Sequence, residues 1–392
     1  ISFYDLKKET DEPSEFYEKF WVFVNQPDYK QAVQSLLRQY NRYIHLKLEE
    51  DDSGLAKNMT GYPGELDQVR CESLEAQMQI WDEEVQAVVS EATSDGKEIW
   101  KKLNAELALE LDHTEMYADY LRLSFAEFLK KYAENSIGIC KKLLQSERKP
   151  KWLYIGNQFC HLLFPERKLL FEIIEKAAAE QVEITLVFSY IREYMLDYIT
   201  ELLDEINRWC EEKRQSVEIV VNDWGMASLV KKSRRNLIPS LGILLNKRRK
   251  DPRIPFKKGE QKWFERNSLN AGFYRNFLER EYGIQRFEWE SCGYEQQIPP
   301  GKNSLHIPFY QTNTSQYCPL GAVCETGERG RQKLAKKCPG YCTEYALLYP
   351  EHLHMIGRYN SLFGIDMRIL KEEEILKNYI QNGVDRVVIR AW

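Results

Sequence analysis

Four cysteines lie close together in the segment CPLGAVCETGERGRQKLAKKCPGYC. Cys318, Cys324, Cys338 and Cys342 follow the spacing C-x5-C-x13-C-x3-C. Thiolates are soft ligands that select zinc or an iron-sulfur cluster, and four of them complete either site. Zinc ribbons usually carry tight C-x2-C pairs, so the wider spacing favours a [4Fe-4S] cluster, with zinc as the alternative. Four unrelated buried thiols fit less well, because the sequence around Cys338 and Cys342 is polar and broken by glycine and proline.

Polar residues also follow several expected strands, at the positions where (β/α)₈ enzymes place their chemistry. Asp223 could act as a base and Trp224 as a stacking surface, while Arg248 and Arg249 could hold an anion. Alternatively, these residues have only a structural role: NDWG would form a tight turn, and NKRRKDPR would form a solvated loop. His306 lies on an expected strand, where a lone histidine is more often packed and hydrogen-bonded than catalytic.

The region around these arginines is strongly basic. Residues 231–262 contain 12 lysines and arginines against two acidic residues, whereas the whole chain has a net charge of −5. If this charge faces one side, it would bind RNA phosphates or an anionic substrate. A basic surface without a nucleic-acid role fits the composition equally well.

These candidates depend on an alternation of strands and helices over residues 149–392. Such a rhythm predicts a (β/α)₈ barrel of the TIM type. It would be somewhat irregular, because the connections after the fifth and sixth strands contain no convincing helix. A doubly wound open sheet is the alternative, since periodicity does not show closure. The eight expected strands are 152–156, 182–190, 217–223, 237–245, 284–290, 304–311, 353–360 and 385–391.

Residues 1–148 have a different sequence pattern and are predicted to form an all-helical domain. Apolar residues recur three and four positions apart in runs such as SEFYEKFWVFVN and FAEFLKKYAENSIGICKKLLQ. At SERKPK, residues 146–151, the helical spacing of apolar residues gives way to alternating strands and helices. This change marks the expected boundary between the helical domain and the barrel.

Three features together resemble a known family. They are YIGNQFC after the first expected strand, HIPFYQTNTSQYC, and the C-x13-C-x3-C run that follows it. They resemble the collagenase-like peptidase superfamily, family U-thirty-two, especially its iron-sulfur branch, over about residues 150–392. The resemblance implies one cluster ligand at the end of an early strand, which would be Cys160. The others would be Cys338, Cys342 and either Cys318 or Cys324, so we keep the compact loop set first and Cys160 in reserve.

The same branch includes the paired UbiU and UbiV proteins of oxygen-independent ubiquinone hydroxylation and related tRNA hydroxylation proteins. The resemblance therefore implies a hydroxylase-like oxidoreductase rather than a peptidase. Its substrate would be an aromatic small molecule, an RNA base or a peptide, and a heteromeric protein partner is possible. The alternative is a binding or scaffold module in which a structural zinc or cluster pins the loop within a protein or RNA complex.

Composition and missing motifs exclude other classes. With 392 residues, 43% of them hydrophobic and 29% charged, the chain suits a globular protein of two or three domains. No G-x-S-x-G, Walker loop, G-x-G-x-x-G or H-E-x-x-H motif is present. No apolar run approaches the roughly 18 residues of a membrane span, and the acidic first residues do not resemble a signal peptide. We therefore expect a cytoplasmic protein with no membrane association.

Overall fold

The computed structural model describes residues 3–8, 20–24, 71–89, 104–146, 148–232, 234–248, 250, 265–349 and 353–391, with a few residues between 30 and 35. The chain forms two compact units. In the first, residues 1–69 with 271–273, strands β1 (Phe3–Lys8) and β2 (Phe20–Val24) pair antiparallel. The second unit, residues 70–270 with 274–392, holds the barrel and the small sheet described below.

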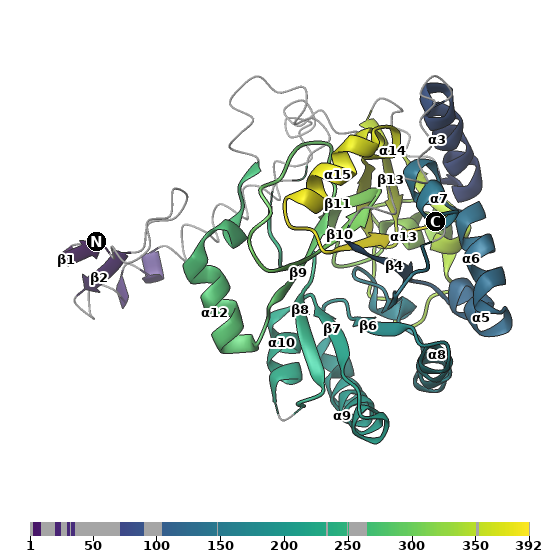
Figure 1. Cartoon of the computed structure of the whole chain (residues 1–392). Coiled ribbons are helices and arrows are strands. Elements are labelled where there is room, and N and C mark those ends of the chain that lie inside the picture. The colour runs from purple at the N-terminus through teal and green to yellow at the C-terminus, as the bar shows by residue number, and fades with distance from the viewer. Residues whose placement is uncertain are drawn as a thin grey trace. The chain divides into compact units, whose positions relative to one another are not determined.

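A closed barrel of eight parallel strands forms the centre of the second unit (Figure 1). The last strand pairs with both β10 and β4, which closes the ring. Closure confirms the predicted (β/α)₈ barrel and excludes the open sheet. In order around the barrel the strands are β4 (Glu106–Leu111), β5 (Trp152–Gly156), β6 (Glu183–Val187), β7 (Val217–Val221), β8 (Leu237–Leu241), β9 (Arg286–Glu290), β10 (Lys302–Ile307) and β15 (Arg386–Ile389).

One barrel strand differs from the prediction. The run 353–360 was expected to be the seventh strand, but β13 (Met355–Arg358) belongs to a separate antiparallel sheet. Its place in the barrel is taken by β4, within residues predicted to be helical. The sequence ELALEL consists of strong helix formers, so its local preference opposes the strand that tertiary pairing imposes. The barrel therefore begins inside residues 1–148, before the predicted boundary.

Helices cover the outside of the barrel and connect most of its strands (Figure 1). Among the described residues no helix lies between β9 and β10, as predicted for the connection after the fifth strand. The connection after the sixth strand was also predicted to lack a helix, but it contains α13 (Pro319–Thr326). None of the described helices has the length and apolarity that a membrane span requires. The helices of this layer are α5 (Thr114–Arg122), α6 (Phe125–Glu134), α7 (Gly138–Leu144), α8 (Arg167–Ala179), α9 (Leu196–Lys213), α10 (Trp224–Lys231), α12 (Gly272–Tyr282), α14 (Met367–Lys371) and α15 (Glu373–Gln381).

The helical prediction for residues 1–148 holds only in part. Helix α3 (Leu74–Val89) and helices α5 to α7 form where apolar residues recur at helical spacing. By contrast β1, β2, β4 and the short β3 (Cys71–Ser73) are strands. The β2 sequence FWVFV is rich in aromatic and β-branched residues, which favour extended backbone.

The barrel interior carries a buried ionic network. His306 on β10 lies between two glutamates, with Nδ1 3.3 Å from Glu110 Oε2 and Nε2 3.0 Å from Glu288 Oε2. Arg390 donates to both carboxylate oxygens of Glu110, at 2.9 and 3.2 Å. Burial lowers the pKa of His306, but its bonds to the two glutamates outweigh burial and raise it overall. Polar residues at inward positions thus explain why β4 lacks the apolar run typical of a parallel strand.

A small sheet of antiparallel strands adjoins the carboxyl end of the barrel, because β11 continues from β10 after one residue, Pro308. Its strand order is β11-β14-β13-β12-β3. The ring of Phe363 packs edge-on against Phe159, which follows β5, with centroids 4.8 Å apart. This contact holds the sheet over part of the barrel mouth, and the cysteine-rich loop connects two of its strands. In this sheet β11 spans Phe309–Thr314, β12 spans Tyr345–Leu348 and β14 spans Ser361–Ile365.

Candidate functional site

Cys160 lies in a tight loop at the carboxyl end of β5. The side-chain oxygen of Asn157 accepts hydrogen bonds from the backbone N–H groups of Phe159 and Cys160, each 2.9 Å long. An asparagine that bonds its own following backbone stabilises such a turn without a strand or helix partner. The short helix η2 (His161–Leu163) begins directly after Cys160, so the position of this partly buried thiol is set by local structure.

Cys318 is the N-cap of helix α13 (Pro319–Thr326). Its sulfur accepts a hydrogen bond from Gly321 N–H at 3.2 Å and donates to the Tyr359 carbonyl at 2.8 Å. Proline at the first helical position suits a helix start, because that position needs no amide hydrogen. Cys324 lies six residues further on, about 9 Å along the helix axis and close to its other end.

Cys338 and Cys342 lie on either side of a sharp turn. Gly340 between them has a φ of +87°, a left-handed conformation that glycine adopts without steric cost. Its N–H donates to the exposed Cys338 sulfur at 3.4 Å. Cys342 is buried in the short helix η6 (Tyr341–Thr343), where its carbonyl accepts from Arg358 Nε at 2.7 Å. The turn thus brings the two thiols within electrostatic range of each other.

Cys160, Cys318, Cys338 and Cys342 converge. Burial raises the pKa of Cys160 to about 12 and that of Cys318 to about 11, and it raises the pKa of Cys342 as well. Mutual charge adds to each shift: Cys160 interacts with Cys318 and Cys338, Cys318 with Cys338, and Cys342 with all three. Cys160 is distant in sequence from the loop that contains Cys318, Cys338 and Cys342, so the barrel and the small sheet bring these thiols together.

The converging thiols form a soft donor set. Thiolates are ligands of both zinc and iron-sulfur clusters. Within the described residues, no group of three His, Cys, Asp or Glu side chains is arranged to hold a single metal ion. The four thiols lie within electrostatic range of one another.

A cleft of about 900 Å³ lies at the barrel mouth, between the ends of β6, β7 and β8 and the strand β11. Three of the four predicted catalytic candidates line it: Asp223, Trp224 and Arg248. The fourth, Arg249, lies outside the described residues, as does all of the basic segment after residue 250. The barrel thus gathers residues from separate strand ends around one cleft.

Asp223 fixes backbone in this cleft. One carboxylate oxygen accepts from Met226 N–H, which caps α10, and the other accepts from Ile191 N–H, each at 2.8 Å. Both oxygens are therefore occupied, which suits a positioning residue better than a base. Trp224 is 39% exposed, and its ring lies 5.2 Å from that of Tyr282. An exposed indole at the mouth remains suited to stacking on a ligand.

A buried acid, Glu290 at the end of β9, organises the opposite wall of the cleft. Lys250 Nζ donates to Glu290 Oε2 at 2.6 Å and to Gln311 Oε1 at 2.8 Å. The Gln311 backbone N–H donates to the second Glu290 oxygen at 2.9 Å, which ties β11 to β9. Burial lowers the pKa of Lys250 to about 8 despite the attraction of Glu290. Sequence analysis missed Glu290, although its alternation with Arg286 and Glu288 in RFEWE indicates inward polar positions.

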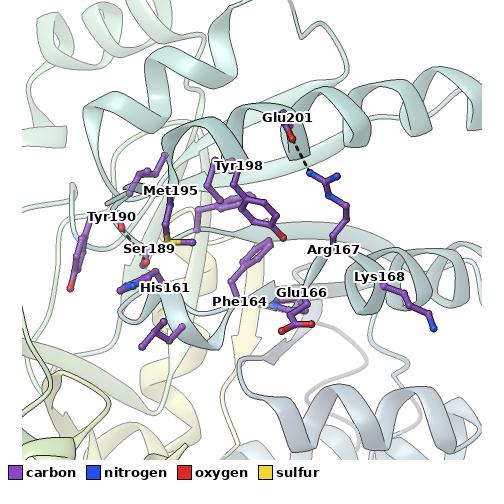
Figure 2. A pocket seen from close by; sticks show the side chains of 15 residues that line it. His161, Phe164, Glu166, Arg167, Lys168, Ser189, Tyr190, Met195, Tyr198 and Glu201 are labelled. Atoms are coloured by element: carbon purple, nitrogen blue, oxygen red, sulfur yellow. Dashed lines mark hydrogen bonds and ion pairs between the residues drawn. The ribbon is translucent and has the colours of Figure 1, made fainter. Parts of the chain in front are cut away.

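A second cleft, of about 750 Å³, lies beside Cys160. Figure 2 shows Phe164, Met195 and Tyr198 around the hollow, with the ion pair between Arg167 and Glu201 at its rim. The ring of Phe164 stacks on that of Phe188 with centroids 4.3 Å apart.

Tyr190 lines both clefts and joins them. Its hydroxyl accepts from Asn360 Nδ2 at 2.9 Å. Burial raises the pKa of this tyrosine, and the charge of Cys160 adds to the rise. The two clefts therefore meet next to the converging thiols.

Other polar residues have structural partners. His306 belongs to the interior network, as its place on a strand suggested, and His354 pairs with Glu84 at 3.1 Å. Asp112 at the end of β4, which sequence analysis missed, bonds His113 at 2.7 Å and accepts from Tyr359 OH. Burial opposes ionisation of Asp112, but these partners and Arg358 lower its pKa to about 2.

Together the fold and the site define a parallel (β/α)₈-barrel protein with four converging thiols at its carboxyl end. No protein-family model matches the chain, and no curated protein matches it. Among solved structures the chain is similar to "The Structure of the U32 Peptidase Mk0906". That similarity has 10% identity and a TM-score of 0.30, and it covers 74% of this chain and 94% of that one. Values this low do not extend to activity.

Proposed function

We propose that the protein is an iron-sulfur enzyme whose Cys160, Cys318, Cys338 and Cys342 bind a [4Fe-4S] cluster at the barrel mouth. The convergence of Cys160 with three thiols of the cysteine-rich loop carries the proposal. Cys160 replaces Cys324 in the proposed set, because Cys324 lies a helix length away from Cys318. An iron-sulfur cluster supplies one-electron transfer when bound.

The mouth cleft is the proposed substrate site, because its wall leads directly to the thiols. Gln316 lines the cleft two residues before Cys318, and its carbonyl accepts hydrogen bonds from Arg192 and Tyr190. Tyr190 also interacts with Cys160. These contacts fix the position of the cleft wall relative to the proposed ligands Cys160 and Cys318. A substrate in the cleft would lie close enough to exchange electrons with the bound cluster.

The proposed reaction class is oxygen-independent hydroxylation, in line with the family resemblance of the sequence. The candidate substrates remain an aromatic small molecule, an RNA base or a peptide. Trp224 supports the first two, since its exposed indole at the cleft offers a surface on which an aromatic ring or a base can stack.

Anaerobic purification followed by iron, sulfide and zinc analysis tests the proposal. We expect about four irons and four sulfides per chain and broad visible absorption. Cys160→Ala and Cys318→Ala should abolish or convert the cluster. Cys324→Ala should retain it, as should the control Cys210→Ala, whose thiol is buried in α9.

Two results would contradict different parts of the proposal. Loss of the cluster in Cys324→Ala with retention in Cys160→Ala would restore the compact loop set as ligands. Stoichiometric zinc without sulfide would overturn the redox function, and a scaffold module with structural zinc would take its place.

A further inference from the structure

The mouth cleft contains an excess of buried positive charge. The side chains of Arg248 and Lys250 are 3% and 6% exposed, and both face the fully buried Glu290. Lys250 Nζ is 2.6 Å from Glu290 Oε2, and Arg248 Nη2 is 3.8 Å from it. Among the described residues Glu290 is the one carboxylate within ion-pair distance of either cation. Two cations and one anion leave a net charge of +1, which is costly to bury without a counter-ion.

Hydrogen bonding in this group is also incomplete. Arg248 Nη2 donates to the Glu290 backbone carbonyl at 2.6 Å, but the buried Nη1 has no hydrogen-bond partner in the part of the chain that the structure describes. The guanidinium lies 5.6 Å from the Trp289 ring centre, so it is held in place beside an aromatic face. A buried donor without an acceptor loses its hydration and gains nothing in exchange. A ligand oxygen would supply the missing acceptor.

The cleft offers room for that ligand on the same side. Lys247 and Arg192 line it together with Arg248 and Lys250, whereas the two acidic lining residues are Glu193 and Asp223. Both oxygens of Asp223 already accept backbone hydrogen bonds. Four cationic lining residues against two acidic ones make the lining electropositive, and a negatively charged group is the chemistry that it complements.

We propose that Arg248 and Lys250 form an anion subsite that binds a carboxylate or phosphate group of the substrate. The identity of the ligand as the substrate rests on the proposed function; the anion site itself does not. Arg248 offers a planar, charged donor of the kind that binds such oxyanions, and Lys250 adds a second charge. Glu290 is the positioning residue, because it bonds Lys250 and anchors β11 through Gln311.

Anion binding can be measured with inorganic phosphate and with acetate as separate probes. The melting temperature of the full chain is followed against each anion, with ionic strength held constant by sodium chloride. We expect both probes to raise it in a saturable way. Arg248→Gln and Lys250→Gln should weaken binding roughly tenfold to a hundredfold, as expected for a lost charge-assisted hydrogen bond. Arg122→Gln, which removes an exposed arginine on α5, serves as the control and should bind normally.

The two probes also identify the source of the anion. Stronger binding of phosphate assigns a phosphorylated substrate, and stronger binding of acetate assigns a carboxylated one. No saturable effect of either anion on the unmodified protein would overturn the subsite, whatever the variants do. Visible absorption of the same samples reports the cluster separately. Anion binding without a cluster would contradict the proposed function alone, and a cluster without anion binding would contradict this inference alone.

Discussion

Replacing His306 by leucine should strongly destabilise the barrel. The imidazole is fully buried and bonds Glu110 at 3.3 Å and Glu288 at 3.0 Å. Leucine has a similar volume, so the change removes the two bonds without leaving a large cavity. Glu110 keeps Arg390 as a partner, and Glu288 keeps the Ser240 hydroxyl at 2.6 Å. Glu288 nevertheless loses the positive charge of protonated His306, so its buried negative charge is left uncompensated.

The size of the effect follows from these contacts. A hydrogen bond to a charged group contributes about 1.5–3 kcal/mol, and removal of one partner from a buried charged group costs about 3–5 kcal/mol. We therefore expect His306→Leu to lower the free energy of unfolding by about 3–5 kcal/mol, a large part of the roughly 5–15 kcal/mol of a typical domain. His354→Asn is the matched control. Its pair with Glu84 has side chains 32% and 41% exposed, so it should cost less than about 1 kcal/mol.

The loss of unfolding free energy in His306→Leu should also depend on pH, and its direction follows from the pKa of His306. The pKa of His306 is raised above its usual value of 6.5 because its bonds to the two glutamates outweigh burial. Protonation therefore stabilises the folded state fully below about pH 6.5, and this contribution disappears as the pH rises through the folded pKa. Glu110, whose pKa is lowered from 4.5, loses its contribution only when the pH falls below that range. The difference in unfolding free energy between the unmodified protein and His306→Leu should be largest near pH 6 and smaller near pH 9.

Urea unfolding followed by far-ultraviolet circular dichroism at about pH 6, 7.5 and 9 measures this difference. A loss below about 1 kcal/mol at pH 6 would refute the reasoning, because the network would then tolerate an uncompensated buried charge. A loss of the same size at pH 6 and pH 9 would show that packing, rather than protonation, accounts for the effect.

Two further predictions concern residues that fix backbone at the strand ends. Asp223→Ala should cost about 1–2 kcal/mol of unfolding free energy, because it removes the cap on Met226 N–H and the acceptor for Ile191 N–H; an unchanged urea midpoint would contradict this role. Tyr132→Phe should cost about 1–3 kcal/mol, since its buried hydroxyl contacts two strand-end carbonyls at 2.9 and 2.8 Å and one N–H at 3.2 Å. The same change at Tyr198, which is 37% exposed, should have less than about 0.5 kcal/mol of effect in the same assay.

Sequence periodicity determined most of the barrel. Strands such as WLYIG and VEIVV are short, mainly apolar and separated by amphipathic helices, and this rhythm suffices to predict a (β/α)₈ fold. The spacing of the cysteines likewise indicated a thiol-rich site after the sixth predicted strand. These features are local, so propensity and patterning express them directly.

Two assignments depended on long-range contacts. β4 could not be recognised from ELALEL, because a strand facing an ionic interior has inward glutamates and resembles a charged helix. β13 looked like a barrel strand, yet it pairs with β12 and β14 in the small sheet. Local sequence fixes neither partner, since strand pairing is decided by which elements can close the barrel and which remain for a second layer.

The candidate site shows the same division. Residue types and spacing placed Asp223, Trp224, Arg248 and the cysteines at strand ends and in one loop. Tertiary structure alone brought Cys160 toward Cys318, Cys338 and Cys342, and it set Glu290 beneath two buried cations. Parallel strands all end at the same face of a closed barrel, so residues far apart in the chain meet there. Which of them face one another follows from barrel closure and from the sheet that covers part of its mouth.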